Sequence, residues 1–246
     1  MTRVDAVIPA LDEEEAIGAV LDALPRPLIR RVVVCDNGSR DATAAIARAR
    51  GAVVVEEARR GYGAACLRAL AALESDPPDV VLFLDADRSD DPAEAPRLLA
   101  PITEGRADLV IGSRVSGERE PGALTPQARF GNWLATGLIR ALYGVRYTDL
   151  GPFRAVRWGP LRSLGMSDRD FGWTVEMQIK AARAGLRSVE VPVRYRKRVG
   201  RSKISGTVAG SVRAGYKILA TIASDCARHG IRRSRSAVRP GGAAAP

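Results

Sequence analysis

The chain has 246 residues, 46% of them hydrophobic, which is enough for one large core or two modest ones. Its net charge of +10 comes mainly from arginine and suits phosphate-bearing partners: nucleic acid, an anionic membrane face or a nucleotide-linked substrate. A single histidine and three widely spaced cysteines argue against histidine-based catalysis, a zinc site and a disulfide framework, and they indicate a reducing, cytoplasmic compartment.

The first half alternates apolar runs with helical patterns. Strands are expected at 4–9, 32–35, 52–56, 80–84 and 109–111, and helices at 12–24, before Gly51, at 63–73 and around Leu98. This alternation predicts an α/β fold with a mostly parallel, doubly wound sheet. Such sheets bind ligands beyond the carboxyl ends of their strands, so the residues after each strand are the candidates for a site.

The second half is less regular. A helical stripe runs from Phe130 to Leu142, for which core packing is the first interpretation and an acceptor-side or membrane-facing surface the second. Residues 189–195 alternate as an edge strand does, and 206–228 predict an amphipathic helix. Residues 1–230 therefore form one expected domain, followed by a disordered basic tail over 231–246. The N-terminus enters a strand directly, and no apolar run approaches the ~18–20 residues of a membrane span, so neither a signal peptide nor a span is expected.

Two aspartates one residue apart follow the fourth strand, in Leu82-Phe83-Leu84-Asp85-Ala86-Asp87. Positions i and i+2 of an extended chain share a face, so Asp85 and Asp87 can direct two carboxylates into one small volume. Mg²⁺ or Mn²⁺ can be held by such oxygens together with bound phosphates. Solvated turn carboxylates are the alternative for the pair alone.

Two further loops after strands carry polar groups. Asp36 follows the second strand and can accept a hydrogen bond from a nucleobase or a ribose hydroxyl, and Glu13 after the first strand can do the same. The segment 59–63, Arg-Arg-Gly-Tyr-Gly, opens a helix where the backbone can approach an anion. A dinucleotide fingerprint and a Walker A motif are both absent, which disfavours a Rossmann dehydrogenase and a P-loop NTPase.

Six motifs together resemble glycosyltransferase family 2, of GT-A fold, in the branch of dolichyl-phosphate mannose synthase and polyprenyl-phosphate glycosyltransferases. The resemblance covers about residues 3–205. The motifs are Ile8-Pro9-Ala10-Leu11-Asp12-Glu13, Asp36-Asn37-Gly38-Ser39-Arg40-Asp41, Leu84-Asp85-Ala86-Asp87, Gly112-Ser113-Arg114, Thr148-Asp149-Leu150-Gly151 and Arg198-Val199-Gly200-Arg201-Ser202-Lys203.

The resemblance implies a metal-dependent hexosyl- or N-acetylhexosaminyl-transferase that inverts the anomeric centre and uses a UDP- or GDP-linked sugar. It assigns Asp85 and Asp87 to Mg²⁺ or Mn²⁺. The nucleotide-sugar site would comprise Pro9, Leu11, Glu13, Asp36, Arg60, Asp85, Ala86, Arg114, Arg198 and Lys203. Arg114, Arg129 and Trp173 would contact the acceptor. Asn37 and Ser89 depart from the family pattern, in which a second Asp and a Gln or His are common.

The acceptor stays open at this point. A polyprenyl phosphate at the membrane surface already carries an anionic oxygen, whereas a soluble hydroxyl acceptor needs a base. Asp149 and Glu176 are the candidate bases, alongside Asp87 as a catalytic residue, and a capping role is the alternative for Asp149. Trp173 could stack on a sugar or pack in the core.

Two other functional classes are weaker. A sugar-phosphate nucleotidyltransferase would be expected to carry a glycine-rich basic loop after the first strand, where this chain has the acidic, glycine-free 9–14. A nucleic-acid binder is disfavoured because aromatic residues are only 5% of the chain and the loops after the strands are largely acidic. The sequence leaves the oligomeric state open, a homo-oligomer included.

Overall fold

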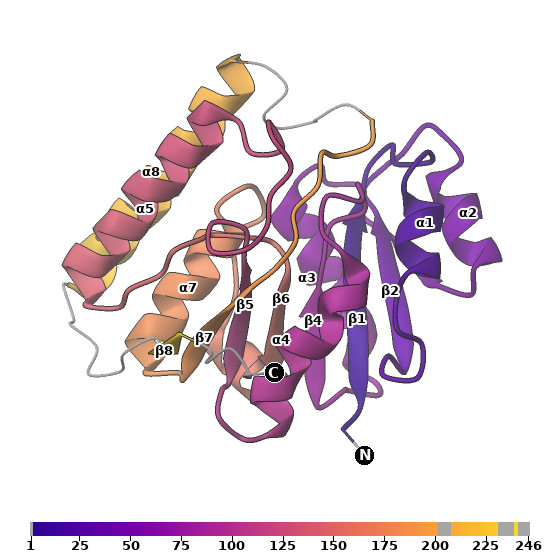
Figure 1. Ribbon diagram of the computed structural model, residues 1–246, viewed down its shortest axis with the longest axis horizontal. Helices are drawn as coiled ribbons and strands as arrows, with labels where there is room; N and C mark the ends of the chain where they lie inside the picture. Colours follow the sequence, from indigo (N-terminus) through magenta and orange to yellow (C-terminus); the bar gives the residue numbers. More distant parts are fainter. Residues whose placement is uncertain (1, 201–207, 231–238, 241–246) are drawn as a thin grey trace.

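The computed structural model describes residues 2–200, 208–230 and 239–240. Within them the strands form one sheet in the order β3-β2-β1-β4-β6-β5-β7-β8 (Figure 1). The strands are β1 (Val4–Ala10), β2 (Arg31–Asp36), β3 (Val53–Glu56), β4 (Val80–Phe83), β5 (Leu109–Ser113), β6 (Arg154–Arg157), β7 (Ser188–Pro192) and the two-residue β8 (Arg239–Pro240). The remainder of the tail expected over 231–246 lies outside the described residues.

The sheet is mostly parallel, which confirms the predicted α/β class. β1 pairs in parallel with β2 and β4, β2 with β3, and β5 with β7. β6 was not expected from the sequence; it lies between β4 and β5 and is antiparallel to both. Because β1, β2 and β4 run in the same direction, their carboxyl ends meet at one edge of the sheet.

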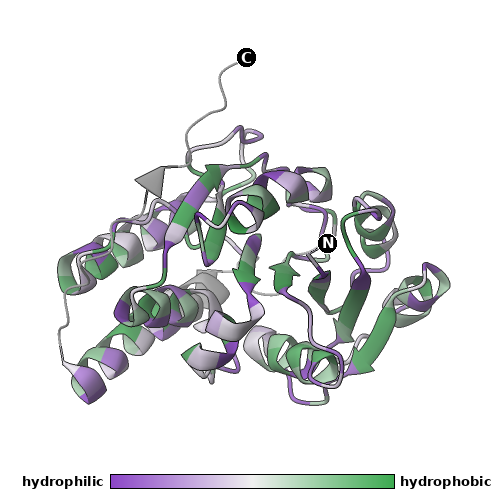
Figure 2. Cartoon of the chain, turned by 90° about the horizontal axis from the view of Figure 1, so that it is seen from below, coloured by the Kyte–Doolittle hydropathy of each residue, from purple (hydrophilic) through white to green (hydrophobic). Residues whose placement is uncertain are grey.

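Helices cover both faces of the sheet (Figure 1). They are α1 (Ile17–Asp22), α2 (Thr43–Ala49), α3 (Tyr62–Leu73), α4 (Ala95–Thr103), α5 (Pro126–Tyr143), α6 (Trp158–Leu164), α7 (Trp173–Ala184) and α8 (Val208–His229), with a 3₁₀ turn η1 at Pro92–Glu94. Alternate strand residues feed two cores: Ala6 and Ile8 pack with α1, α2 and α4, whereas Val7 packs with α3, α5, α6 and α7. The strands are accordingly among the most hydrophobic segments in Figure 2.

Helices α5 and α8 pack side by side and form an outer layer beyond α7 (Figure 1). The predicted stripe on α5 is only partly core: Ile139 is fully buried, but Phe130 and Trp133 are 62% and 68% exposed. Core packing is therefore the wrong interpretation for these two aromatic residues. Among the described residues, no helix combines the length and apolar character needed to cross a membrane.

Candidate functional site

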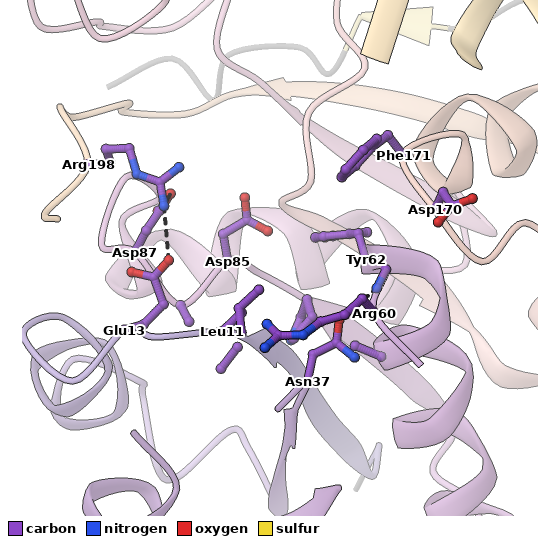
Figure 3. A pocket seen from close by; sticks show the side chains of 15 residues that line it. Leu11, Glu13, Asn37, Arg60, Tyr62, Asp85, Asp87, Asp170, Phe171 and Arg198 are labelled. Atoms are coloured by element: carbon purple, nitrogen blue, oxygen red, sulfur yellow. Dashed lines mark hydrogen bonds and ion pairs between the residues drawn. The ribbon is translucent and has the colours of Figure 1, made fainter. Parts of the chain in front are cut away.

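A cavity of about 310 Å³ opens where β1, β2 and β4 end (Figure 3). It brings together seven residues that the resemblance assigns to the donor and Asp87, which it assigns to the metal. The seven are Pro9, Leu11, Glu13, Arg60, Asp85, Ala86 and Arg198. The rest of its lining consists of Ala10, Asn37, Gly61, Tyr62, Ala65, Asp170 and Phe171. Loops that follow separate strands thus converge on one concave site, as expected for a sheet of this topology.

The loop after β4 crowds three carboxylates into one turn. Asp85 and Asp87 line the cavity, and Asp90 approaches the Asp85 backbone nitrogen with an Oδ2–N distance of 3.4 Å. Burial, reinforced by the charge on Asp87, raises the pKa of Asp85 to about 7, although the Tyr62 hydroxyl opposes the rise. Burial and the charges on Asp85 and Asp87 likewise raise the pKa of Asp90. Ionisation of all three carboxylates together is therefore unfavourable unless a cation stands near them.

One arginine supplies a positive charge near these carboxylates. Arg198 Nη2 lies 2.9 Å from Glu13 Oε1 and 3.3 Å from Asp87 Oδ2. The segment that carries Arg198 is tied to the turn by its backbone, because Val199 N donates to Asp87 O and Arg196 N donates to Ser89 O. A cation therefore stands between the loop after β1 and the loop after β4, at the place where a diphosphate could bind.

The loop before α3 is organised by Asn37. Its Nδ2 donates to the carbonyls of Glu57 and Arg59 at 2.9 and 2.8 Å, and its Oδ1 accepts from Gly61 N at 2.8 Å. An ionised aspartate, which only accepts hydrogen bonds, could not donate to those carbonyls. The asparagine that departs from the family pattern thus fixes the loop that presents Arg60 to the cavity.

Three of the predicted donor residues lie elsewhere or outside the described chain. Asp36 Oδ1 accepts from Ser39 N at 2.9 Å, and Asp36 is not among the residues that line the cavity. Arg114 is held by Asp149, whose Oδ1 and Oδ2 accept from Nη2 and Nε at 2.7 and 2.8 Å. Lys203 lies outside the described residues.

Both candidate bases are engaged in holding other groups. Asp149 is fully buried, and both of its oxygens accept hydrogen bonds from Arg114. Glu176 accepts from Ser167 N and Asp168 N, and its Oε1 lies 2.8 Å from Lys180 Nζ. Burial alone would raise the pKa of Glu176, but the bonds from Lys180 and the loop outweigh it and leave the pKa lowered. Neither carboxylate lines the cavity.

The predicted acceptor residues do not gather at the cavity. Trp173 is 1% exposed and packs against Phe83 with ring centroids 6.3 Å apart, so its ring is not available to stack on a sugar. Arg129 instead lines a second cavity, of about 590 Å³, together with the exposed aromatic pair of α5, Phe130 and Trp133. Arg119 and Thr148 line the same cavity.

Seven lining residues were not predicted as site residues from the sequence, and three of these carry an aromatic or acidic side chain: Tyr62, Asp170 and Phe171. Tyr62 stands at the start of α3, and Asp170 and Phe171 precede α7. Tyr62 belongs to the glycine-containing segment that had been singled out, so its position carried a signal. Asp170 and Phe171 lie in the irregular second half, and only their place immediately before a helix could have drawn attention to them.

The donor atoms at this site fit a divalent cation. Asp85 Oδ1 and Asp90 Oδ1 are buried, and neither has a hydrogen-bond partner among the described residues. Hard carboxylate oxygens in that condition suit Mg²⁺ or Mn²⁺. Across the described part of the chain, no three acidic, histidine or cysteine side chains surround a common point. Phosphate oxygens and water would complete the coordination shell of an ion held by these carboxylates.

The comparisons with known proteins agree with this geometry. The family model described as glycosyl transferase family 2 matches residues 5–165. An uncharacterised glycosyltransferase of Mycobacterium tuberculosis is 39% identical over 212 residues, which cover 85% of this chain and 93% of the relative. The undecaprenyl-phosphate mannosyltransferase of Micrococcus luteus is 33% identical over 227 residues, which cover 85% of this chain and 90% of that protein.

A solved structure is similar over nearly the whole chain. Glucosyl-3-phosphoglycerate synthase of Mycobacterium tuberculosis, crystallised with Mn²⁺, UDP and phosphoglyceric acid, has a TM-score of 0.71 and 27% identity. The similarity covers 92% of this chain and 78% of the synthase. The family match, the curated relatives and the cavity that collects the motif residues lead to one conclusion: the chain belongs to glycosyltransferase family 2.

Proposed function

We propose that this glycosyltransferase transfers a sugar from a nucleoside-diphosphate sugar to a polyprenyl phosphate, with inversion at the anomeric carbon. The observation that carries the proposal is Asp85, whose buried Oδ1 lacks a hydrogen-bond partner among the described residues at the end of β4. Asp85 and Asp87 would hold Mg²⁺ or Mn²⁺, which supplies positive charge against the diphosphate when it is bound. The synthase crystallised with UDP and Mn²⁺ supports a uridine nucleotide as the first donor to test.

The lining residues divide into two roles. Pro9, Leu11 and Glu13 form the wall near β1 where a nucleobase can bind. Arg198 offers a guanidinium to the diphosphate, because it already stands between two carboxylates at the end of the sheet. Stabilisation of the charge that develops on the leaving diphosphate is the largest contribution such a site can make.

A lipid-linked phosphate is the acceptor that the structure supports best. The second cavity combines Arg119 and Arg129 with the exposed rings of Phe130 and Trp133. Arginines suit a phosphate, and exposed aromatic residues on a helix without acidic residues suit the surface of an anionic membrane. The relative that acts on undecaprenyl phosphate supports the same choice. The protein would then bind the membrane peripherally.

The alternative is a soluble hydroxyl acceptor, which the phosphoglyceric acid bound to the similar synthase favours. A hydroxyl acceptor must lose its proton to a base, and such general-base catalysis typically increases the rate by ~10²–10⁴-fold. Asp149 and Glu176 are both occupied by other groups. A phosphate acceptor, already anionic, needs little such help.

Transfer assays with paired acceptors test the proposal. UDP-glucose, UDP-N-acetylglucosamine and GDP-mannose would each be offered with Mn²⁺ to vesicles containing undecaprenyl phosphate and, separately, to phosphoglycerate and glycerol. We expect transfer to the lipid phosphate with one of the donors and loss of transfer when EDTA removes the metal. Transfer only to the soluble acceptors would overturn the lipid acceptor, and no transfer from any nucleotide sugar would overturn the donor chemistry.

A further inference from the structure

Four acidic residues line the donor cavity: Glu13, Asp85, Asp87 and Asp170. Asp170 is the one to which no role has yet been given. Glu13 is paired with Arg198, and Asp85 and Asp87 belong to the proposed metal site. Asp170 and the adjacent Phe171 lie on the side of the cavity opposite Glu13 and Arg198 (Figure 3). A half-exposed carboxylate and a half-buried aromatic ring thus stand together across the cavity from the diphosphate side.

The loop that presents this pair is held from within. Asp168 Oδ1 accepts from the backbone nitrogens of Asp170 and Gly172 at 2.7 and 3.1 Å. Glu176 accepts from Ser167 N and Asp168 N, and so joins the loop to the first turn of α7. The backbone of the loop is therefore hydrogen-bonded to fixed carboxylates on both sides.

The start of α3 holds the same loop from outside. Gly63 N donates to Asp170 O at 3.1 Å, and Ala64 N donates to Arg169 O at 2.9 Å. The contact is so close that a Cβ on Gly63 would lie 2.1 Å from Asp168 O, and one on Gly61 would lie 2.9 Å from Asp170 Oδ1. The backbone of the loop that carries Asp170 is thus fixed, and the Asp170 carboxylate lies beside Gly61 at the cavity. A group that recognises a ligand needs to be held in place in this way before the ligand binds.

The Asp170 carboxylate has only weak competition for its oxygens. Its nearest cation in the described structure is Lys217 of α8, with Nζ 3.7 Å from Oδ2, and the stronger contact of that lysine is to Asp168 Oδ2 at 3.1 Å. An ionised carboxylate accepts up to about four hydrogen bonds, and neighbouring sugar hydroxyls are paired donors. An aromatic ring beside it can cover the apolar C–H face of the sugar.

We propose that Asp170 and Phe171 form the subsite for the sugar of the donor, and that they select a neutral sugar with free neighbouring hydroxyls over a uronic acid. This inference rests on the proposed function, because the diphosphate bound at the opposite side directs its sugar across the cavity. A carboxylate accepts from hydroxyls, and it repels the carboxylate of a uronic acid by like charge.

The test compares donors that share one nucleotide. Asp170→Asn keeps the shape and removes the charge, Phe171→Leu keeps an apolar group and removes the ring, and Asp22→Asn on exposed α1 is the matched control. Calorimetry with UDP and Mn²⁺ should give the same affinity, within about twofold, for all four proteins. Loss of one charge-assisted hydrogen bond should lower kcat/KM for UDP-glucose by about 10–100-fold in Asp170→Asn.

The ratio of two donors separates recognition from a merely structural effect. The preference for UDP-glucose over UDP-glucuronate should fall in Asp170→Asn and stay unchanged in the control, whereas a disturbed loop would lower both donors alike. An unchanged ratio with normal UDP binding would overturn the inference and leave the proposed function intact. Failure of the wild-type protein to bind any nucleoside diphosphate would instead overturn the proposed function and the inference with it.

Discussion

Arg198 Nη2 lies 3.3 Å from Asp87 Oδ2, so a guanidinium contacts one of the two carboxylates proposed to bind the metal. The same nitrogen lies 2.9 Å from Glu13 Oε1. The arginine therefore occupies the position of a cation between two acidic loops, and a diphosphate that enters with a metal would offer it new acceptors. Removal of the Arg198 guanidinium should therefore affect the binding of the nucleotide and the binding of the metal alone in different ways.

Arg198→Gln should weaken the binding of nucleoside diphosphate with Mn²⁺ and leave the binding of Mn²⁺ alone unchanged or stronger. A hydrogen bond to a charged group contributes about 1.5–3 kcal/mol, which corresponds to a 10–100-fold higher Kd for the nucleotide. Mn²⁺ alone gains because its competitor for Asp87 is gone. Titration calorimetry measures both, with the exposed Arg194→Gln as control. Weaker binding of both ligands would contradict the role given to Arg198.

The affinity for Mn²⁺ should rise with pH between about 6 and 8. The pKa of Asp85 is raised to about 7, first by burial and then by the charge on Asp87, so the proton competes with the metal below that pH. The raised pKa means that Asp85 keeps its proton to a higher pH in the folded protein than in the unfolded chain. Mn²⁺ binds the ionised carboxylate, so loss of this proton favours the metal-bound form as the pH increases. Calorimetric titration with Mn²⁺ alone at several pH values measures the effect. Asp85→Asn should bind Mn²⁺ weakly and without this pH dependence, and a flat wild-type profile would refute the expectation.

Gly63→Ala should destabilise the fold and reduce donor binding together. The new methyl group would lie 2.1 Å from Asp168 O, so the loop carrying Asp170 must move. We expect a loss of about 1–3 kcal/mol in the free energy of unfolding, as for an overpacked site. Gly137→Ala in α5 is the control, because nothing lies within 4 Å of its added Cβ, and it should stabilise the helix by about 0.5–1 kcal/mol. Urea denaturation measures the free energy of unfolding of both variants and of the wild type. Equal stability of Gly63→Ala and the wild type would show that the loop can accommodate the added methyl group.

Asp149→Asn should lower stability because Asp149 anchors Arg114. The carboxylate is fully buried and accepts two side-chain bonds and one backbone bond from Arg114. Breaking one partner of a buried ion pair costs about 3–5 kcal/mol. A general base would give the opposite pattern, with unchanged stability and a rate lower by ~10²–10⁴-fold. Urea denaturation and single-turnover kinetics on the same variant distinguish the two roles.

The first half of the site could be predicted because each of its motifs follows a strand. Burial of strands on both faces made the apolar runs of β1, β2 and β4 easy to recognise, and parallel topology brings their carboxyl ends together. Asp85, Asp87 and Glu13 therefore reached one cavity as the resemblance implied. The ion pairs of Arg198 with Asp87 and Glu13 could not be predicted from the sequence, because they join residues that are 111 and 185 positions apart in the chain.

The second half was harder for physical reasons. Helix α7 buries Trp173, Val175, Met177 and Ile179 at a spacing of two, so it lacks the single apolar stripe of a surface helix. Strand β6 has four residues and an arginine at each end. The contact of Arg114 with Asp149 spans 35 residues and depends on the turn before β6. Trp173 is buried as the first residue of α7, which the sequence pattern did not predict as a helix. Without that helix, the loop that carries Asp170 gave no signal of a site.

The exposed aromatic pair on α5 provides the last prediction, which concerns the membrane. Phe130 and Trp133 are 62% and 68% exposed, with ring centroids 5.8 Å apart, and the first turn of α5 contains no acidic residue. Exposed aromatic rings beside arginines favour insertion at the headgroup level of an anionic bilayer. The double variant Phe130→Ala, Trp133→Ala should lower co-sedimentation with vesicles of phosphatidylglycerol and phosphatidylcholine by about tenfold.

The control for this variant is Leu28→Ala, since Leu28 is also exposed, at 42%, but lies before β2 at the other end of the sheet. Its vesicle binding should match that of the wild type. Binding of nucleoside diphosphate with Mn²⁺ should stay intact in every variant, because neither α5 aromatic residue nor Leu28 lines the donor cavity. Equal sedimentation of the double variant and the wild type would remove α5 as the membrane-binding surface, whereas selective loss would connect that surface to the second cavity and its two arginines.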